Sequence, residues 1–211
     1  MVERELIVSD DVAGEAARIF LEQAPRTLAL AGGGTPRALY ALLAQREYDW
    51  PSLEVFFGDE RCVPPDHPNS NFRMANETLL SKVRARVHRM RGESCDAAGY
   101  EEELRSVFGP GLPRFDLALL GMGADGHTAS LFPGDAALEE RERLVVRVSR
   151  PDHERLTLTL PALSAAKVAL FLVSGADKRV ALSRVLAGED LPAARVAAEQ
   201  VVFVTDREAA G

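Results

Sequence analysis

His127 is the residue of this 211-residue chain whose surroundings are best suited to catalysis. It lies in GMGADGHTASLFP, residues 121–133, directly after an apolar run and among glycines that allow a sharp turn out of a strand. A neutral imidazole can take a proton from water near neutral pH, so His127 is a candidate general base. Asp125 is the second catalytic candidate because it could orient the ring. A turn histidine without a chemical role is the alternative.

The residues after His127 indicate the start of a helix. Thr128 or Ser130 would cap this helix, and residues 129–132 would form its first turn before a Pro-Gly pair ends it. The predicted order is therefore strand, glycine-rich turn, histidine and short helix.

A second glycine-rich segment, AGGGTPRALY at residues 31–40, follows another aliphatic run. Consecutive glycines let a backbone come close to a ligand, Thr35 is the expected N-cap, and Pro36 suits the first helical position. Free N–H groups and the helix dipole at such a point attract an anion, most naturally a phosphate. The segment lacks the GKS or GKT and GxGxxG patterns of nucleotide-binding loops, and a plain tight turn is the alternative.

Cations follow two other strand-like runs. Arg61 stands in GDERCVPPDHPNSNF, residues 58–72, where it could bind a phosphate or carboxylate through two hydrogen bonds. An Asp–Arg surface cluster that satisfies itself is the alternative, and the triplet at residues 69–71 is interpreted as capping chemistry. Lys178 falls in the first turn of a predicted helix, where a cation opposes the helix dipole, so a shared anion would explain it better.

Strand-like runs alternate with helix-like ones along the chain. Aliphatic runs lie at 5–9, 27–32, 53–60, 115–123, 167–175 and 201–206, and residues 10–24 have helical spacing with Asp10 or Asp11 as the N-cap. The segments 143–149 and 155–161 alternate more strictly, as half-exposed antiparallel or edge strands do. This order predicts an α/β fold, an open, mostly parallel sheet flanked by helices with a small antiparallel edge element.

We expect residues 1–211 to form a single domain. In open α/β sheets, ligands bind beyond the carboxyl ends of the strands at a topological switch point, so the segments around His127, Arg61, Lys178 and the glycine triplet should meet there.

Composition excludes several classes of partner. The formal net charge of −7 argues against a nucleic-acid surface, which needs clustered cations, but not against a small anion. Cys62 and Cys95 are too few and too far apart for a metal knuckle or a disulfide framework, so we expect free thiols in a reducing compartment. No run approaches the ~18 apolar residues of a membrane span, so we expect a soluble, cytoplasmic protein without a membrane partner.

Two familiar catalytic patterns are missing from the sequence. Neither the HExxH pattern of a zinc site nor the GxSxG pattern of an acyl-enzyme serine occurs, so we expect no metal site. A hydrolytic reaction would then proceed by direct attack of water.

Taken together, these segments resemble the 6-phosphogluconolactonases, within a wider group that includes glucosamine-6-phosphate deaminases and isomerases. The resemblance runs in order through AGGGTP, FFGDERCVPPDHPNSNF, DLALLGMGADGHTASLFP, RLTLTLP and SGADK. It implies a modified Rossmann-like fold and hydrolysis of a sugar phosphate lactone, 6-phospho-D-glucono-1,5-lactone, to 6-phosphogluconate without a cofactor.

The resemblance also implies roles for individual residues. By position, His127 matches the catalytic histidine of the family, and the phosphate-binding groups would be Arg61, Lys178, Gly33, Gly34 and Thr35. Arg155 is a further candidate for substrate contact, with a plain strand-end charge as the alternative.

Two rival functions stay open. Asp59 occupies the region in which an isomerase or deaminase needs a carboxylate to move a proton at C2, and it is also a candidate for substrate contact. A non-catalytic sugar-phosphate sensor would keep the anion site without a base. The protein could be a monomer or a weak homodimer.

Overall fold

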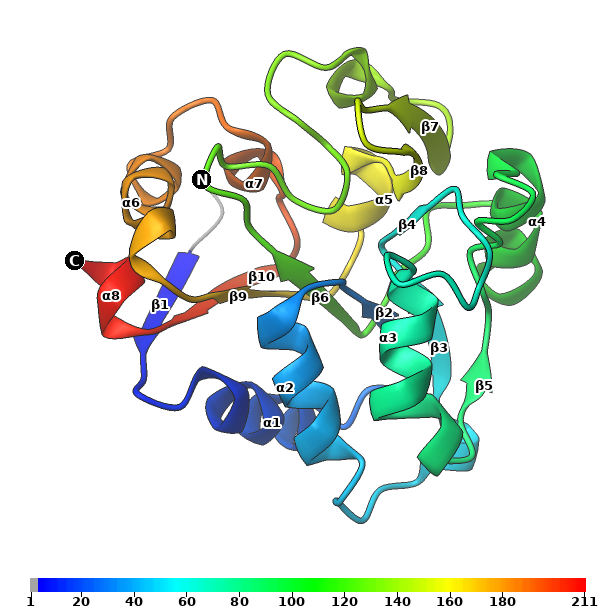
Figure 1. Ribbon diagram of the computed structural model, residues 1–211, viewed down its shortest axis with the longest axis horizontal. Helices are drawn as coiled ribbons and strands as arrows, with labels where there is room; N and C mark the ends of the chain where they lie inside the picture. The colour runs from blue at the N-terminus through cyan, green and yellow to red at the C-terminus, as the bar shows by residue number, and fades with distance from the viewer. Residues whose placement is uncertain (1–3) are drawn as a thin grey trace.

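A parallel β-sheet forms the centre of the computed structural model, which describes residues 4–211 (Figure 1). Over these residues seven strands are hydrogen-bonded in the order β1-β10-β9-β6-β2-β3-β5, and each neighbouring pair is parallel. The strands are β1 (Arg4–Val8), β2 (Thr27–Leu30), β3 (Glu54–Phe57), β5 (Arg86–Val87), β6 (Leu117–Gly121), β9 (Val168–Val173) and β10 (Gln200–Thr205). The predicted α/β class is confirmed.

Helices cover both faces of this sheet. In Figure 1, α1 (Val12–Gln23), α2 (Gly34–Leu43) and α3 (Asn71–Thr78) lie below the sheet, whereas α5 (Leu160–Ser164), α6 (Arg179–Leu186) and α7 (Pro192–Arg195) lie above it. The remaining α-helices are α4 (Ala97–Phe108), which packs against the smaller sheet, and α8 (Arg207–Ala210), which packs against α6. Short 3-10 helices lie at Trp50–Ser52, Leu80–Lys82, Ala136–Glu139 and Ala176–Lys178. Within residues 4–211, no helix combines the length and the apolar character needed to cross a lipid bilayer.

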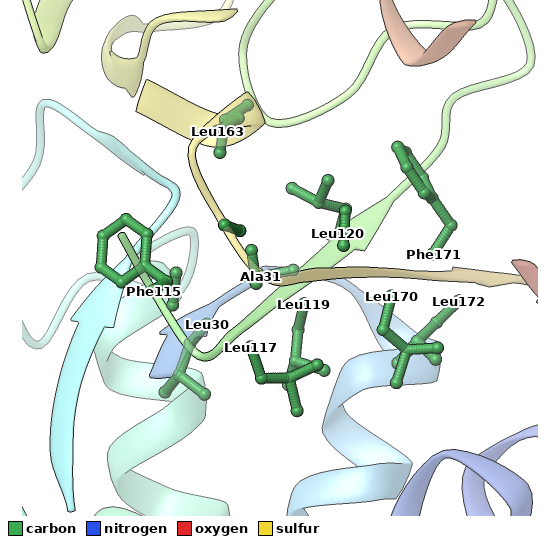
Figure 2. Close-up of a cluster of buried hydrophobic side chains, with 14 of the residues drawn as sticks. Leu30, Ala31, Phe115, Leu117, Leu119, Leu120, Leu163, Leu170, Phe171 and Leu172 are labelled. Carbon is green, nitrogen blue, oxygen red and sulfur yellow. The ribbon is translucent and has the colours of Figure 1, made fainter. Parts of the chain in front are cut away.

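The central strands are apolar because helices bury both of their faces. Side chains of β6 and β9 alternate between the two faces (Figure 2). Leu119 and Leu170 point toward the side of α2, whereas Leu120 and Phe171 point to the opposite side, where Leu163 of α5 lies. Each of these side chains is at most 1% exposed, so the carboxyl ends of the two strands are fixed by packing from both sides.

The strictly alternating segments form a second, antiparallel sheet, as predicted. Over the described residues its order is β4-β8-β7, from β4 (Asp59–Arg61), β8 (Glu154–Leu158) and β7 (Val145–Ser149). The aliphatic run at 53–60 therefore divides at Gly58, where the chain leaves the parallel sheet and enters the antiparallel one. Arg61 is consequently a strand residue of the smaller sheet.

The strand order reverses between β2 and β6. From β2 the chain proceeds to β3 on one side, and from β6 it proceeds to β9 on the other side. The carboxyl ends of β2 and β6 therefore border the crevice in which sheets of this kind bind ligands.

The expectation of free thiols is wrong. Cys62 and Cys95 form a disulfide, with their Cα atoms 5.0 Å apart. A separation of 33 residues does not limit distance in the fold, because the turn before α4 returns to the end of β4.

Candidate active site

A cavity opens at the switch point, beyond the carboxyl ends of β2 and β6, with a volume of about 240 Å³. Among the residues that the structure describes, its polar side chains are Asp59, Arg61, Asn71, His127, Arg155 and Lys178, and Gly33 also lines it. Six predicted site residues thus meet in one place, as the switch-point argument requires. Within residues 4–211, no group of three or more His, Cys, Asp or Glu side chains is arranged to hold a metal ion.

Three predicted residues, Gly34, Thr35 and Asp125, do not line this cavity. Gly34 lines an adjoining hollow of about 330 Å³, which shares Gly33, Arg61 and Asn71 with the first cavity. Thr35 lines neither of these two cavities.

Asp125 is hydrogen-bonded to His127. Nδ1 of His127 lies 2.6 Å from Oδ1 of Asp125, which also accepts the backbone N–H of His127 at 3.1 Å. Partial burial raises the pKa of Asp125, but these two hydrogen bonds outweigh burial and hold the pKa below its ordinary value. Because an ionised carboxylate can only accept, Nδ1 carries the ring proton and Nε2 is left as the basic atom.

A tight turn holds this pair at the end of β6. The N–H of Gly123 donates to the His127 carbonyl at 2.9 Å, and the N–H of Gly126 donates to the Gly123 carbonyl at 3.0 Å. A Cβ at Gly123 would collide with the His127 ring, so only glycine leaves room for the imidazole. Gly126 has a φ of +81°, in the left-handed region that favours glycine.

The predicted helix after His127 is wrong. Residues 128–131 form a turn in which the Leu131 N–H donates to the Thr128 carbonyl at 2.9 Å. Ser130 is fully buried, its Oγ donates to Oδ2 of Asp59 at 2.6 Å, and its N–H donates to Oγ1 of Thr157 at 3.2 Å. These long-range hydrogen bonds replace the local bonds of a helix, and a capping pattern in the sequence cannot reveal them.

Gly33, rather than Thr35, is the N-cap of α2. Its φ of +109° and ψ of 173° suit only glycine, so the helix begins at Gly34, and Pro36 occupies the third helical position instead of the first. The first N–H groups of a helix have no intrahelical acceptor, and Gly33 has no side chain to cap them. Gly33 lines the cavity and Gly34 lines the adjoining hollow, so the positive end of the helix dipole lies beside the site.

Two buried tyrosines fix the ends of the strands that lead into the site. The Tyr40 hydroxyl accepts the N–H of Ala31 at 3.0 Å and donates to its carbonyl at 2.8 Å. The Tyr100 hydroxyl binds Phe57 in the same way, at 2.8 and 3.3 Å. Burial raises the pKa of both tyrosines, so they stay protonated and keep these strand ends in place.

The smaller sheet places two arginines side by side at the cavity. Arg61 on β4 is the register partner of Arg155 on β8. Arg155 pairs with Asp152 at 2.7 Å, whereas the guanidinium of Arg61 donates only to neutral acceptors, Oδ1 of Asn71 at 2.5 Å and the carbonyl of Asn69 at 3.2 Å. Within residues 4–211, no carboxylate forms an ion pair with Arg61. Like charges opposite one another repel, so a bound anion would stabilise this arrangement.

Two buried carboxylates precede Arg61. Oδ2 of Asp59 accepts from Ser130 at 2.6 Å and Oδ1 accepts from Nδ2 of Asn71 at 3.1 Å. Glu60 accepts four hydrogen bonds of 2.7–2.9 Å, from the N–H groups of Arg61, Asn71 and Phe72 and from the Ser70 hydroxyl. Burial raises the pKa of Glu60, and these donors offset that effect only in part. Both carboxylates thus hold the start of α3 against β4.

Lys178 reaches the cavity from the connection after β9. It ends the 3-10 helix at Ala176–Lys178 and is the N-cap of α6, so it lies just before the first turn of the α-helix, whereas the sequence predicted it in that turn. Its ammonium group pairs with Asp177 at 2.8 Å. The helix dipole does not explain a cation at this end, whereas an anion in the cavity would.

Asn71 is the polar cavity residue that the sequence interpretation assigned only to capping. The cap of α3 is instead Ser70, whose hydroxyl accepts the Arg73 N–H at 3.1 Å. The sequence carried a signal, because one cap suffices for one helix and the triplet offered three candidates.

The fold and the site together define a doubly wound α/β protein with a cation-rich cavity at the switch point of its sheet. Residues 5–204 match the family model "Glucosamine-6-phosphate isomerases/6-phosphogluconolactonase", and the chain belongs to this family. A 6-phosphogluconolactonase of Synechocystis sp. is 41% identical over 202 residues, which cover 91% of this chain and 83% of that protein.

Solved structures agree with this family assignment. The 6-phosphogluconolactonase from Trypanosoma cruzi superposes with a TM-score of 0.91 at 29% identity, covering 99% of this chain and 96% of its own. A monomeric glucosamine-6-phosphate deaminase superposes with a TM-score of 0.84 at 24% identity, covering 99% of this chain and 98% of its own, and so shares the fold. The fold alone therefore does not choose between hydrolysis and deamination, and the choice depends on the site.

Proposed function

We propose that the chain hydrolyses 6-phospho-D-glucono-1,5-lactone to 6-phosphogluconate, with water activated by His127 and without a covalent intermediate. The observation that carries this proposal is that one cavity holds a histidine bound to Asp125 together with three cations, Arg61, Arg155 and Lys178. Two of these cations pair with an aspartate, whereas the Arg61 guanidinium has no carboxylate partner within residues 4–211. The family relatives named above support it, since the Synechocystis and Trypanosoma proteins are 6-phosphogluconolactonases.

The chemical step needs one base. Nε2 of His127 takes a proton from water as the water oxygen attacks C1 of the lactone, which gives a tetrahedral intermediate. When the bond between C1 and the ring oxygen breaks, the same Nε2 returns its proton to that oxygen, so atoms and charge balance. Asp125 keeps the proton of the neutral ring on Nδ1 and stabilises the imidazolium that forms between the two transfers.

The phosphate end is assigned to the cations and the glycine loop. Arg61 and Lys178 would bind the phosphate, with the N–H groups of Gly34 and Thr35 at the start of α2 beside them and Arg155 as a further contact. Binding energy from this remote group orients C1 toward the water held by His127. The N–H groups of Gly123 and Gly126 are engaged in the turn, which favours Gly32 and Gly33, before the start of α2, as the source of oxyanion donors.

Direct attack by water agrees with the lining of the cavity. None of the described residues that line it is a serine, threonine or cysteine, so no hydroxyl or thiol nucleophile faces the proposed substrate. A lactone is an activated ester, for which a positioned water and one base suffice.

The hydrogen bonds of Asp59 argue against the isomerase or deaminase alternative. That chemistry needs a carboxylate free to take a proton from C2 of the sugar. Both oxygens of Asp59 already accept hydrogen bonds, one from buried Ser130 and one from Asn71. The carboxylate therefore stabilises the fold around the cavity and is not free to take that proton.

The test is the lactone assay, run against a blank for spontaneous hydrolysis. The chain should hydrolyse 6-phosphogluconolactone far above the blank, and His127→Ala should lower kcat by about 10²–10⁴-fold. His67→Ala is the matched control, because His67 lies outside both cavities. Undiminished turnover in the His127 variant would contradict the mechanism, and ammonia release from glucosamine 6-phosphate would support the rival function.

A further inference from the structure

The side chain of Asn71 lies between the Asp59 carboxylate and the Arg61 guanidinium and is hydrogen-bonded to both. It is 3% exposed and begins α3, and its Nδ2 donates to the Asp59 carbonyl at 2.9 Å and to Oδ1 of Asp59 at 3.1 Å. Its Oδ1 accepts from Nη1 of Arg61 at 2.5 Å. An ordered chain therefore runs from a carboxylate through an amide to a guanidinium.

The chemistry of the groups fixes the donor and acceptor of each of these hydrogen bonds. The Asp59 carboxylate and carbonyl can only accept, so the NH₂ group of Asn71 must face Asp59 and its oxygen must face Arg61. The backbone of Asn71 is fixed as well, because its N–H donates to Oε1 of buried Glu60 at 2.7 Å. Asn71 therefore offers Arg61 one oxygen in a set place.

Arg61 keeps its charge available because its partner is an amide. A direct contact with Asp59 would orient the guanidinium but would neutralise it. The protein acceptors of the Arg61 guanidinium within residues 4–211 both bind Nη1, which leaves Nη2 and Nε for the two parallel hydrogen bonds that a phosphate accepts.

Asn71 also lies between the glycine loop and Arg61, the two groups that are proposed to bind the phosphate. A Cβ at Gly32 would collide with the Asn71 amide, so the glycine loop lies directly against this side chain. The amide thus stands between the loop that leads into α2 and the strand that carries Arg61.

We propose that Asn71 is a positioning residue for phosphate binding, which holds the Arg61 guanidinium in a fixed, uncompensated orientation beside the glycine loop. This inference rests on the proposed function, since it takes Arg61 as a phosphate contact. It goes further in assigning the neighbouring amide a role in substrate affinity rather than in capping.

A double-mutant cycle with two readouts tests the proposal. Asn71→Ala should raise KM for the phosphorylated lactone and weaken binding of inorganic phosphate, followed by calorimetry, each by about 10- to 100-fold, because a hydrogen bond to a charged group is lost. kcat should change much less, since His127 is untouched. Arg61→Ala should give similar losses, and adding Asn71→Ala to it should cost nothing further, because the amide acts through Arg61.

Ser130→Ala is the matched control, because it removes the other hydrogen bond to Asp59 without touching Arg61. It should leave KM and phosphate binding near those of the parent chain. If Asn71→Ala is not recovered folded, Asn71→Ser, which suits a helix N-terminus but is too short to reach Arg61, replaces it in the same cycle.

Additive effects of the two substitutions, or an equal fall in kcat and rise in KM, would overturn the positioning role. These outcomes are separate from failure of the proposed function. That failure would appear as absent lactone hydrolysis by the unmodified chain, whatever its affinity for phosphate.

Discussion

At the scale of single residues, the site depends on pairs in which one side chain orients another. Asp125 orients the His127 ring by accepting a hydrogen bond from Nδ1, and the ring also packs against Phe132, with 4.4 Å between the ring centres. The pair is partly open to solvent, with 30% of the His127 side chain and 50% of the Asp125 side chain exposed. Water can therefore reach the base, and the carboxylate acts through orientation as much as through charge.

Asp125→Asn tests this division of roles. The amide keeps the shape but can present an NH₂ group to Nδ1, which favours the wrong tautomer of His127. We expect kcat to fall by about 10- to 100-fold, less than the ~10⁴-fold loss known for a fully buried carboxylate in a catalytic triad, because Asp125 is half exposed. Steady-state kinetics with the lactone measure this, with Asp49→Asn as an exposed control. An unchanged kcat would show that Asp125 only shapes the turn.

At the scale of secondary-structure elements, the three strands that enter the site are tied together at their opposite ends. Asp116, just before β6, accepts the N–H groups of Arg26 and Thr27 at the start of β2, at 2.9 and 3.0 Å. Its other oxygen pairs with Lys167, just before β9, at 2.6 Å. One carboxylate thus joins the starting ends of β2, β6 and β9, far from the cavity at their carboxyl ends.

Stability should therefore depend on pH through Asp116. Burial raises its pKa, but Lys167 and the two N–H groups outweigh burial and leave the pKa below its ordinary value. A depressed carboxyl pKa contributes stability above the ordinary value of about 3.9, and this contribution is lost as pH falls through the folded-state pKa. Asp116→Asn should cost about 1–2 kcal/mol at pH 7, and the difference from the parent chain should shrink below about pH 4.

Thermal unfolding of both proteins between pH 7 and pH 3 measures this difference, with exposed Asp66→Asn as the control. kcat should be unchanged at pH 7, because Asp116 lies at the opposite edge of the sheet from the cavity. A difference in unfolding free energy that stays constant over this range would contradict the assignment.

Local patterns predicted the elements more successfully than they predicted the contacts between them. The apolar runs ending near glycine indicated β2, β6 and β9, and the strict alternation indicated β7 and β8, because burial on one or two faces leaves a direct trace in the sequence. The division at Gly58 and the turn at Thr128–Leu131 could not be predicted in this way. Both depend on partners far along the chain, namely β8 for the first and the Ser130 contact with Asp59 for the second.

The candidate site shows the same difference. His127, Arg61 and Lys178 could be found because each follows an apolar run, and the sheet brings the ends of such runs together. Asn71 could not be assigned to the site in this way, because its position against Gly32 and Arg61 exists only after α3 has packed beside α2 and β4.

At the scale of the whole molecule, the disulfide joins the smaller sheet to the segment that leads into α4. Cys62 directly follows Arg61 at the end of β4, and Cys95 directly precedes Asp96, the N-cap of α4. The turn before Cys95 packs tightly here, since a Cβ at Gly92 would collide with the Arg61 carbonyl. The crosslink therefore closes a loop of the chain that includes α3 and β5.

Reduction of this disulfide should lower stability while leaving the site assembled. Closing a loop over 33 residues stabilises a fold by roughly 3–4 kcal/mol in the chain-entropy account, so a dithiol reductant should lower the unfolding free energy by about that amount. KM should stay close to that of the oxidised protein, because β4 remains paired with β8, and the Cys62 N–H donates to the Glu154 carbonyl at 2.8 Å without help from the sulfur atoms. Denaturant titrations with and without reductant measure the effect. The Cys62→Ser/Cys95→Ser variant should have the unfolding free energy of the reduced protein, and the reductant should not change it. Two titratable thiols in the native protein before reduction would contradict the crosslink, and a large rise in KM on reduction would show that it also positions Arg61.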